Sequence, residues 1–210
     1  MSDINRRDAL KAFAVISVAN VLDVGAPQLE RTIRAVESLE PGQLYTPKFF
    51  NRHEWQTVRL LVDYVIPRDA RSGSATDAKV PEFMDFLLAD KDASDASKLS
   101  MRGGLAWLDN ESRSRFTRTF LNASDSQRRQ ILDDIAWPKK ARPEMSHGVA
   151  FFTRFRDFTA SGFFSTAMGW RDVQYIGNVF NPSWNGCPTA AMEKLGVSQD
   201  LMNVRVSSNK

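Results

Sequence analysis

The stretch from Phe151 to Pro188 constrains the fold most, because it begins as a helix and cannot continue as one. Its first part places Phe151, Phe155 and Phe158 on one face of a helix. We expect that helix to end at Gly162, since glycine readily adopts the left-handed conformation that closes a helix. Beyond Gly162, glycines and prolines alternate with large aromatic residues. This pattern predicts an irregular arm whose rings are buried, either against the upstream helices or against another protein.

Upstream of this stretch, the apolar residues follow helical spacing, and prolines divide the pattern into short helices. The clearest pattern runs from about residue 47 to residue 66, with Thr46 and Pro47 as its expected start. Pro67 should end this helix, because the residue before a proline is pushed out of helical geometry. Strand signals are nearly absent, since no alternating runs flank a tight turn. The sequence therefore predicts an all-α chain, a single helical domain of about six or seven helices with an irregular, aromatic, Gly/Pro-rich C-terminal arm.

Two local features have structural explanations. Gly103 and Gly104 stand together inside a helical pattern, where each glycine costs about 1 kcal/mol relative to alanine, so we expect close backbone packing there. The polar loop from Arg68 to Lys79 carries Asp69 and Asp77, whose spacing also suits a cation site. We interpret the two aspartates as turn-forming residues of a surface loop.

Several classes of chemistry have no signature in the chain. The net charge of +3 is spread along the sequence, which argues against nucleic-acid binding. The single cysteine, Cys187, and two distant histidines, His53 and His147, do not give the spacing of a metal or haem site. Dinucleotide-binding and nucleophile-elbow motifs are also missing. We therefore predict no catalytic, cofactor-binding or metal-binding residues, and a protein that is not an enzyme by itself.

The N-terminus has the pattern of a twin-arginine export signal. Arg6 and Arg7 are followed by Leu10, Lys11 and a moderately apolar run over residues 12–22, too short and too polar to span a bilayer. The alternative is an ordinary amphipathic first helix. A cleavable signal should end in small residues, but here Pro27 directly follows the only approximation to such a site. We therefore favour a signal that is retained and becomes a structured helix.

Three segments carry a resemblance to a known family. The string SGFFSTAMGWRDVQYIGN, residues 161–178, resembles the C-terminal signature of the gluconate 2-dehydrogenase subunit 3 family. Two earlier segments fit the same family, LLVDYVIPRDARSGSATDAKVPEFMD at residues 60–85 and GGLAWLD at residues 103–109. The resemblance runs from about Phe49 to Pro188. These family members are small subunits of bacterial flavin-dependent sugar and sugar-acid dehydrogenases.

The resemblance implies a non-catalytic small subunit of a periplasmic hetero-oligomer. The catalytic partner would be an FAD-dependent dehydrogenase of the glucose–methanol–choline type that oxidises a sugar or polyol, and a cytochrome c subunit would take the electrons. The small subunit would aid export, maturation and stability of that partner, which the twin-arginine translocase would carry across already folded. Any membrane association would be made through the complex. The alternative is a stand-alone periplasmic helical binding protein or enzyme with a pocket of its own.

The predicted organisation follows from these features. We expect a twin-arginine signal over residues 1–26, a helical domain over 27–150, an aromatic helix and partner-docking arm over 151–188, and a tail over 189–210. Large exposed aromatic patches usually mark contact surfaces, and Tyr and Trp are enriched among interface hot spots. The predicted interface residues, with Tyr175 and Trp184 as anchors, are Trp170, Tyr175, Gly177, Asn178, Phe180 and Trp184. In the alternative, these rings fold back onto the phenylalanines of the preceding helix and complete the core.

Overall fold

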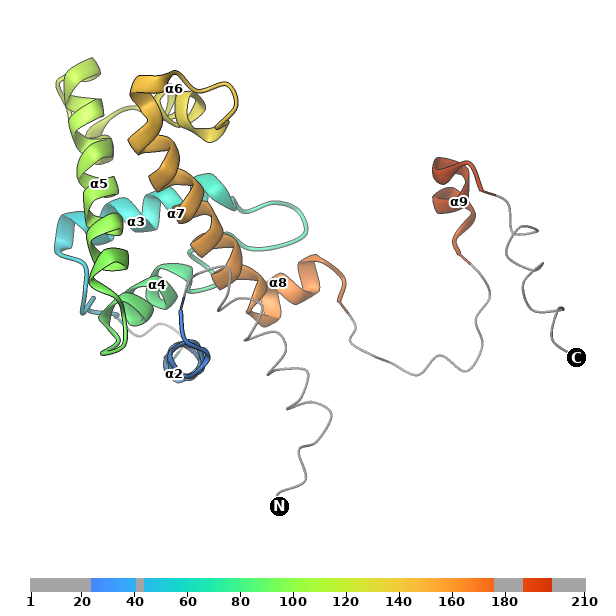
Figure 1. The fold of residues 1–210 in the computed structure, drawn as a ribbon. Helices are drawn as coiled ribbons and strands as arrows, with labels where there is room; N and C mark the ends of the chain where they lie inside the picture. Colours follow the sequence, from blue (N-terminus) through green and yellow to red (C-terminus); the bar gives the residue numbers. More distant parts are fainter. Residues whose placement is uncertain (1–23, 41–43, 176–186, 198–210) are drawn as a thin grey trace, which may run out of the picture. The chain divides into compact units, whose positions relative to one another are not determined.

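The computed structural model describes residues 24–40, 44–175 and 187–197 (Figure 1). These residues confirm the all-helical prediction, because they contain eight α-helices, two short 3-10 helices and no strand. The elements are α2 (Ala26–Glu37), α3 (Arg52–Val65), α4 (Val80–Ala89), α5 (Asp95–Phe116), η1 (Phe120–Asn122), α6 (Asp125–Ala136), η2 (Pro143–Met145), α7 (Ser146–Phe164), α8 (Ala167–Asp172) and α9 (Thr189–Leu195). None of the described helices is both long and apolar enough to cross a bilayer.

The chain divides into two compact units, one ending at Tyr175 and one beginning at Ile176. The first unit contains α2 to α8, and α9 belongs to the second. In the second unit, α9 starts directly after Pro188 and ends at Gly196, whose φ of 64° is in the left-handed region that favours glycine. Both α8 and α9 lie in segments for which the sequence predicts no regular structure.

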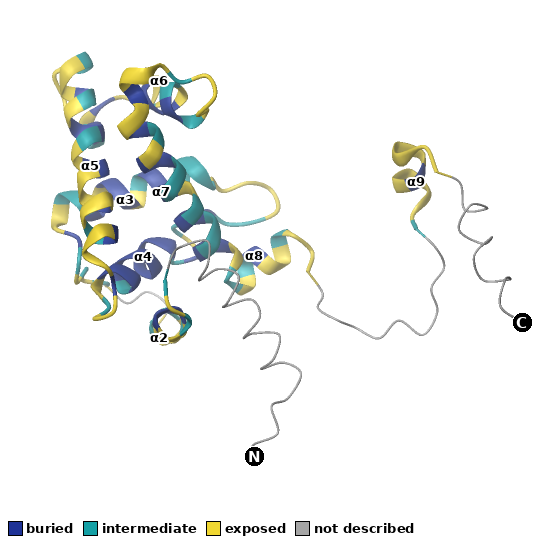
Figure 2. Ribbon diagram, viewed as in Figure 1, coloured by how far each residue is buried: buried dark blue, intermediate teal, exposed yellow. Residues whose placement is uncertain are grey.

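Helix α7 forms the centre of the first unit. It packs against α3, α4, α5, α6 and α8, and its buried side faces these neighbours (Figure 2). The helical pattern predicted from Phe151 onward accounts for this position, because Phe151, Phe155, Phe158 and Phe163 are all buried in the hydrophobic core. The aromatic face that the sequence shows is therefore the core face of the central helix.

Gly162 does not end α7, so that prediction is wrong. The helix continues to Phe164, and Gly162 lies in its interior. A Cβ atom at this position would lie 2.9 Å from Cδ1 of Phe83, on α4. The glycine is thus needed for the close approach of α7 to α4, not for a left-handed turn.

The predicted packing role of the glycine pair in α5 is confirmed for one of its members. A Cβ atom on Gly104 would lie 1.8 Å from the ring of Phe151, whereas a Cβ atom on Gly103 would meet nothing within 4 Å among the described residues. Gly104 therefore permits the contact between α5 and α7, and Gly103 faces open space.

Helix α3 ends as predicted but starts later. Its C-cap is Ile66, directly before Pro67. Its N-cap is Asn51 rather than Thr46, and Asn51 forms a capping box with Glu54 in which each side chain accepts a hydrogen bond from the other residue's backbone N–H, both at 2.9 Å. The segment before Asn51 is held outside the helix, because a buried carboxylate of α4 binds its backbone.

The loop between α3 and α4 confirms the turn-forming role of its aspartates. Asp69 accepts hydrogen bonds from the backbone N–H groups of Arg71 and Ser72, both at 2.8 Å. Asp77 accepts one from the backbone N–H of Ser74 at 2.7 Å and pairs with Arg68 at 2.7 Å. These are the hydrogen bonds expected of turn-forming aspartates.

Candidate partner-binding surfaces

The first candidate surface is built on the tight turn between α7 and α8. The Thr166 hydroxyl accepts a hydrogen bond from the backbone N–H of Gly169 at 3.1 Å and donates one to the Phe163 carbonyl at 2.7 Å. A Cβ atom on Gly169 would lie 2.3 Å from that same carbonyl oxygen. Only a glycine therefore lets α8 fold back so closely on the end of α7, and this turn sets the direction of the next residue, Trp170.

Four large apolar side chains between residues 164 and 175 remain exposed. Trp170 is 41% exposed and Tyr175 is 53% exposed, and their rings meet edge to face with centroids 6.0 Å apart. Phe164 and Val173 are exposed beside them in the sequence. We refer to these residues, Phe164, Trp170, Val173 and Tyr175, as the α8 patch. Exposed apolar groups that gather in one place mark contact surfaces more often than single ones do.

The α8 patch is fixed to the rest of the first unit. Arg71, in the loop between α3 and α4, donates a hydrogen bond to the backbone carbonyl of Asp172 and pairs with its carboxylate at 3.2 Å. Met168 packs against the hydrophobic core from the inner side of α8. A surface held in this way needs little ordering when a partner binds, which favours affinity.

The predicted interface residues fall into two groups. The structure brings Trp170 and Tyr175 together in the α8 patch. The other four, Gly177, Asn178, Phe180 and Trp184, lie outside the described residues, as do Arg6 and Arg7 of the export signal. The phenylalanines onto which the rings could have folded are buried among the helices. For Trp170 and Tyr175, exposure favours the docking interpretation, and a partner at this surface stays a prediction.

The second candidate surface rests on a buried carboxylate. Asp85 of α4 is 0% exposed. It accepts hydrogen bonds from the Tyr45 hydroxyl at 2.6 Å and from three consecutive backbone N–H groups, those of Lys48 at 2.7 Å, Phe49 at 2.9 Å and Phe50 at 3.0 Å. These bonds fix the segment before α3 against α4. We call this arrangement the Asp85 clamp.

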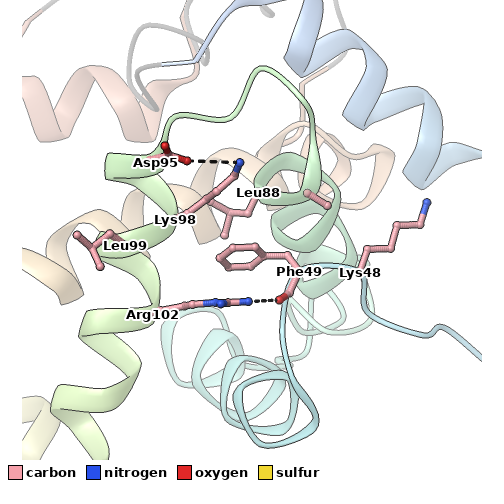
Figure 3. Close-up of a pocket in the computed structure, with 8 residues that line it drawn as sticks. Lys48, Phe49, Leu88, Asp95, Lys98, Leu99 and Arg102 are labelled. Atoms are coloured by element: carbon pink, nitrogen blue, oxygen red, sulfur yellow. Dashed lines mark hydrogen bonds and ion pairs between the residues drawn. The ribbon is translucent and has the colours of Figure 1, made fainter.

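The clamp places Lys48 and Phe49 at the edge of an open groove, together with the end of α4 and the first turns of α5 (Figure 3). The guanidinium of Arg102 stacks 4.5 Å from the centre of the Phe49 ring and donates a hydrogen bond to the Phe49 carbonyl at 2.7 Å. Leu88 and Leu99 complete the apolar lining. We call this the Phe49 groove. Sequence reasoning missed it, because its residues come from three separate segments of the chain.

Burial raises two pKa values close to the clamp. Burial, followed by the hydrogen bond to Asp85, raises the pKa of Tyr45. Burial likewise raises the pKa of Glu82, one turn before Asp85 on α4, and its Oε2 atom has no hydrogen-bond partner among the described residues. Protonation of Glu82 thus favours folding. Its stabilising contribution is present below the pKa of an unfolded carboxyl and is lost as pH rises through the raised value.

The described residues hold no group of three or more His, Cys, Asp or Glu side chains that could bind a metal ion. His53 has a structural contact, since its Nε2 lies 2.6 Å from Oδ2 of Asp109. Asp109 also accepts a hydrogen bond from the backbone N–H of Phe120 at 2.9 Å, so it joins α3, α5 and η1. The described residues thus offer two surfaces for binding. The α8 patch is aromatic, and the Phe49 groove is apolar with cations around it.

The family model for gluconate 2-dehydrogenase subunit 3 matches residues 52–182. The chain belongs to the gluconate 2-dehydrogenase subunit 3 family. The match confirms the resemblance seen in the sequence, and it runs from the first residue of α3 through the whole α8 patch. Searches of curated proteins and of solved structures give no match. As a subunit 3 family member, the protein is related to a small subunit of dehydrogenase complexes.

Proposed function

We propose that this protein is the non-catalytic small subunit of a periplasmic, FAD-dependent sugar or polyol dehydrogenase of the glucose–methanol–choline type. It aids the export, maturation and stability of the catalytic subunit, which holds the FAD, and a cytochrome c subunit accepts the electrons. Family membership supports the class of complex. The α8 patch, an exposed aromatic surface inside the family match, is the observation that supports a role in binding a partner.

The α8 patch has the kind of surface that binds other proteins. Tyr and Trp bury large, rigid areas and are enriched among the few residues that dominate interface energies. The α8 patch offers both, on a turn that Thr166 and Gly169 fix in place. Family membership and an anchored aromatic surface together favour a binding subunit over a stand-alone enzyme.

The test is co-purification of the tagged protein with the flavoprotein encoded next to it. We expect the complex to show flavin absorbance and dehydrogenase activity, and the isolated chain to show neither. A stoichiometric flavin or haem in the isolated, folded chain would contradict the proposal. Binding of a sugar by the isolated chain would favour the alternative, a stand-alone periplasmic protein with a pocket of its own.

Alanine substitutions in the α8 patch should weaken the complex without unfolding the subunit. For Trp170→Ala and Tyr175→Ala we expect a loss of about 2 kcal/mol each, which is about a 30-fold rise in Kd. The melting temperature of the isolated chain should change little, because both side chains are exposed. The predicted anchor Trp184 belongs to the same series.

The matched control is Trp137→Ala, which removes another exposed tryptophan, 64% accessible, at the end of α6. This variant should bind the catalytic subunit as the wild type does. If the α8 variants melt early in isolation yet hold the partner normally once folded, the patch is part of the core and the interface claim is wrong.

Substitution of Arg6 and Arg7 by lysine should leave the catalytic subunit in the cytoplasm, although that subunit itself is unchanged. The reason is that the twin-arginine head of the small subunit is the signal for the whole complex. Flavoprotein activity in periplasmic and cytoplasmic fractions measures the effect, with Arg34→Lys on the exposed side of α2 as the control. Normal periplasmic activity in the double variant would show that the partner travels independently. A mature chain that begins at Pro27 would rule out a retained signal.

A further inference from the structure

We propose that the Phe49 groove is a second docking site, which receives an acidic, amphipathic segment of the catalytic subunit. This inference rests on the proposed function, since it names a second contact with the same partner. It concerns residues that neither the sequence pattern nor the α8 patch assigns to an interface.

The apolar lining of the groove is incompletely covered. Leu99, which lines the groove from the first turns of α5, is 74% exposed, whereas the ring of Phe49 is half-buried and Leu88 is buried (Figure 3). In the figure, the Phe49 ring lies between Leu88 and the Arg102 side chain. An apolar side chain of a partner that entered here would be covered by leucine and aromatic carbon, and the area it buries would contribute to binding.

The polar rim of the groove is mainly cationic, which favours a negatively charged partner segment. Lys48 has no ion pair among the described residues, and its ammonium lies 4.9 Å from the centre of the Phe86 ring. Lys98 approaches Asp95, the one carboxylate of the lining, only to 4.0 Å, and Arg102 approaches Glu54 only to 3.8 Å. Close pairs elsewhere in the fold, such as Arg115 with Glu111, reach 2.6 Å. The rim cations are therefore weakly neutralised and can receive carboxylates of a partner. Complementary charge of this kind steers association and suppresses wrong partners.

The groove is formed before any partner arrives. The Asp85 clamp holds the backbone N–H groups of Lys48, Phe49 and Phe50. On the other wall, Arg102 binds the Phe49 carbonyl and stacks on its ring. A preformed apolar lining with cations around it fits a segment that places apolar residues on one side and carboxylates on the other, and binding to it costs little ordering.

The first test is photo-crosslinking in the intact complex, purified with its flavin. A benzophenone amino acid replaces Leu99, and in a separate control it replaces the exposed Ser114 near the other end of the same helix. We expect Leu99 to capture the catalytic subunit, in a peptide of net negative charge with apolar residues at helical spacing, and Ser114 not to capture it. Capture of a second copy of this chain or of lipid alone would overturn the proposal, as would an intact complex with no crosslink at Leu99. Failure to form any complex would instead contradict the proposed function.

The second test reverses the charge of the groove's rim and measures binding of the catalytic subunit. The double variant Lys48→Glu with Lys98→Glu should raise the Kd for the catalytic subunit at least about tenfold at low salt and flatten its salt dependence. Lys139→Glu with Lys140→Glu changes the net charge equally on an exposed turn after α6 and should have no such effect. The melting temperature of the isolated double variant should match the wild type. An unchanged Kd and salt dependence in the groove variant would overturn the proposal.

Discussion

Replacement of Asp85 by alanine should lower the free energy of unfolding by about 3 kcal/mol or more. Three backbone N–H groups and the Tyr45 hydroxyl would lose their acceptor. The hydrogen bond from Phe50 is buried and the other three are partly buried. A buried donor left without a partner costs about 1–3 kcal/mol. The total stability of a domain is typically about 5–15 kcal/mol, so this loss is a large share of it. The variant should also lose the groove, because the segment that carries Phe49 is no longer held.

Urea denaturation of the isolated chain, followed by circular dichroism, measures the effect. Asp85→Asn should fall between alanine and wild type, because the amide oxygen still accepts some of the hydrogen bonds. Asp95→Ala, at a fully exposed position, should stay within about 0.5 kcal/mol of wild type. An alanine variant at position 85 that is as stable as Asp95→Ala would show that the clamp contributes little.

Alanine substitutions at the two adjacent glycines of α5 should have opposite effects. Gly103→Ala should stabilise the protein by up to about 1 kcal/mol, because it removes the helix cost of glycine and meets nothing within 4 Å among the described residues. Gly104→Ala should destabilise it by about 1–3 kcal/mol or more. The added Cβ would lie 2.1 Å from Cγ of Phe151, close to that residue's backbone, so the ring cannot swing aside without moving α7.

Thermal unfolding of the two variants side by side gives the comparison. Because the substitution is identical and the positions are neighbours, differences in the unfolded state largely cancel. A rise of the melting temperature in both variants would show that α5 and α7 can separate to accept the extra atom, and a fall in both would contradict the prediction for Gly103.

The sequence predicted helices well where their limits are local. Pro67 ends α3 because of its own geometry, and the Phe151 pattern marks the core face of α7. The start of α3 also had a local signal, since Asn51 and Glu54 have the spacing of a capping box. Thr46 and Pro47 also have the pattern of a helix start, and no nearby residue shows that Asp85, far along the chain, binds the backbone between them and Asn51. The prediction that Gly162 ends α7 was wrong for a similar reason, because Phe83, the residue that Gly162 packs against, belongs to another helix.

The two candidate surfaces also differ in whether residues close together in the sequence form them. Trp170 and Tyr175 lie close together in the sequence, so one segment and its family resemblance were enough to single them out. The Phe49 groove combines the segment before α3, the end of α4 and the start of α5. Each of its lysines and leucines looks ordinary alone, and only the fold brings them together.

The Asp85 clamp also sets an order of events during synthesis. The donors of the clamp leave the ribosome 35–40 residues ahead of Asp85. Gln28 of α2 leaves 59 residues ahead of Leu87, whose carbonyl its side chain binds. At about 5–20 residues per second, the segment before α3 waits roughly 2–8 s for its acceptor. Helix α4 is thus the element whose emergence allows the N-terminal part of the domain to close. Until then, α2 and the segment before α3 are accessible to the factors that meet nascent proteins at the ribosome.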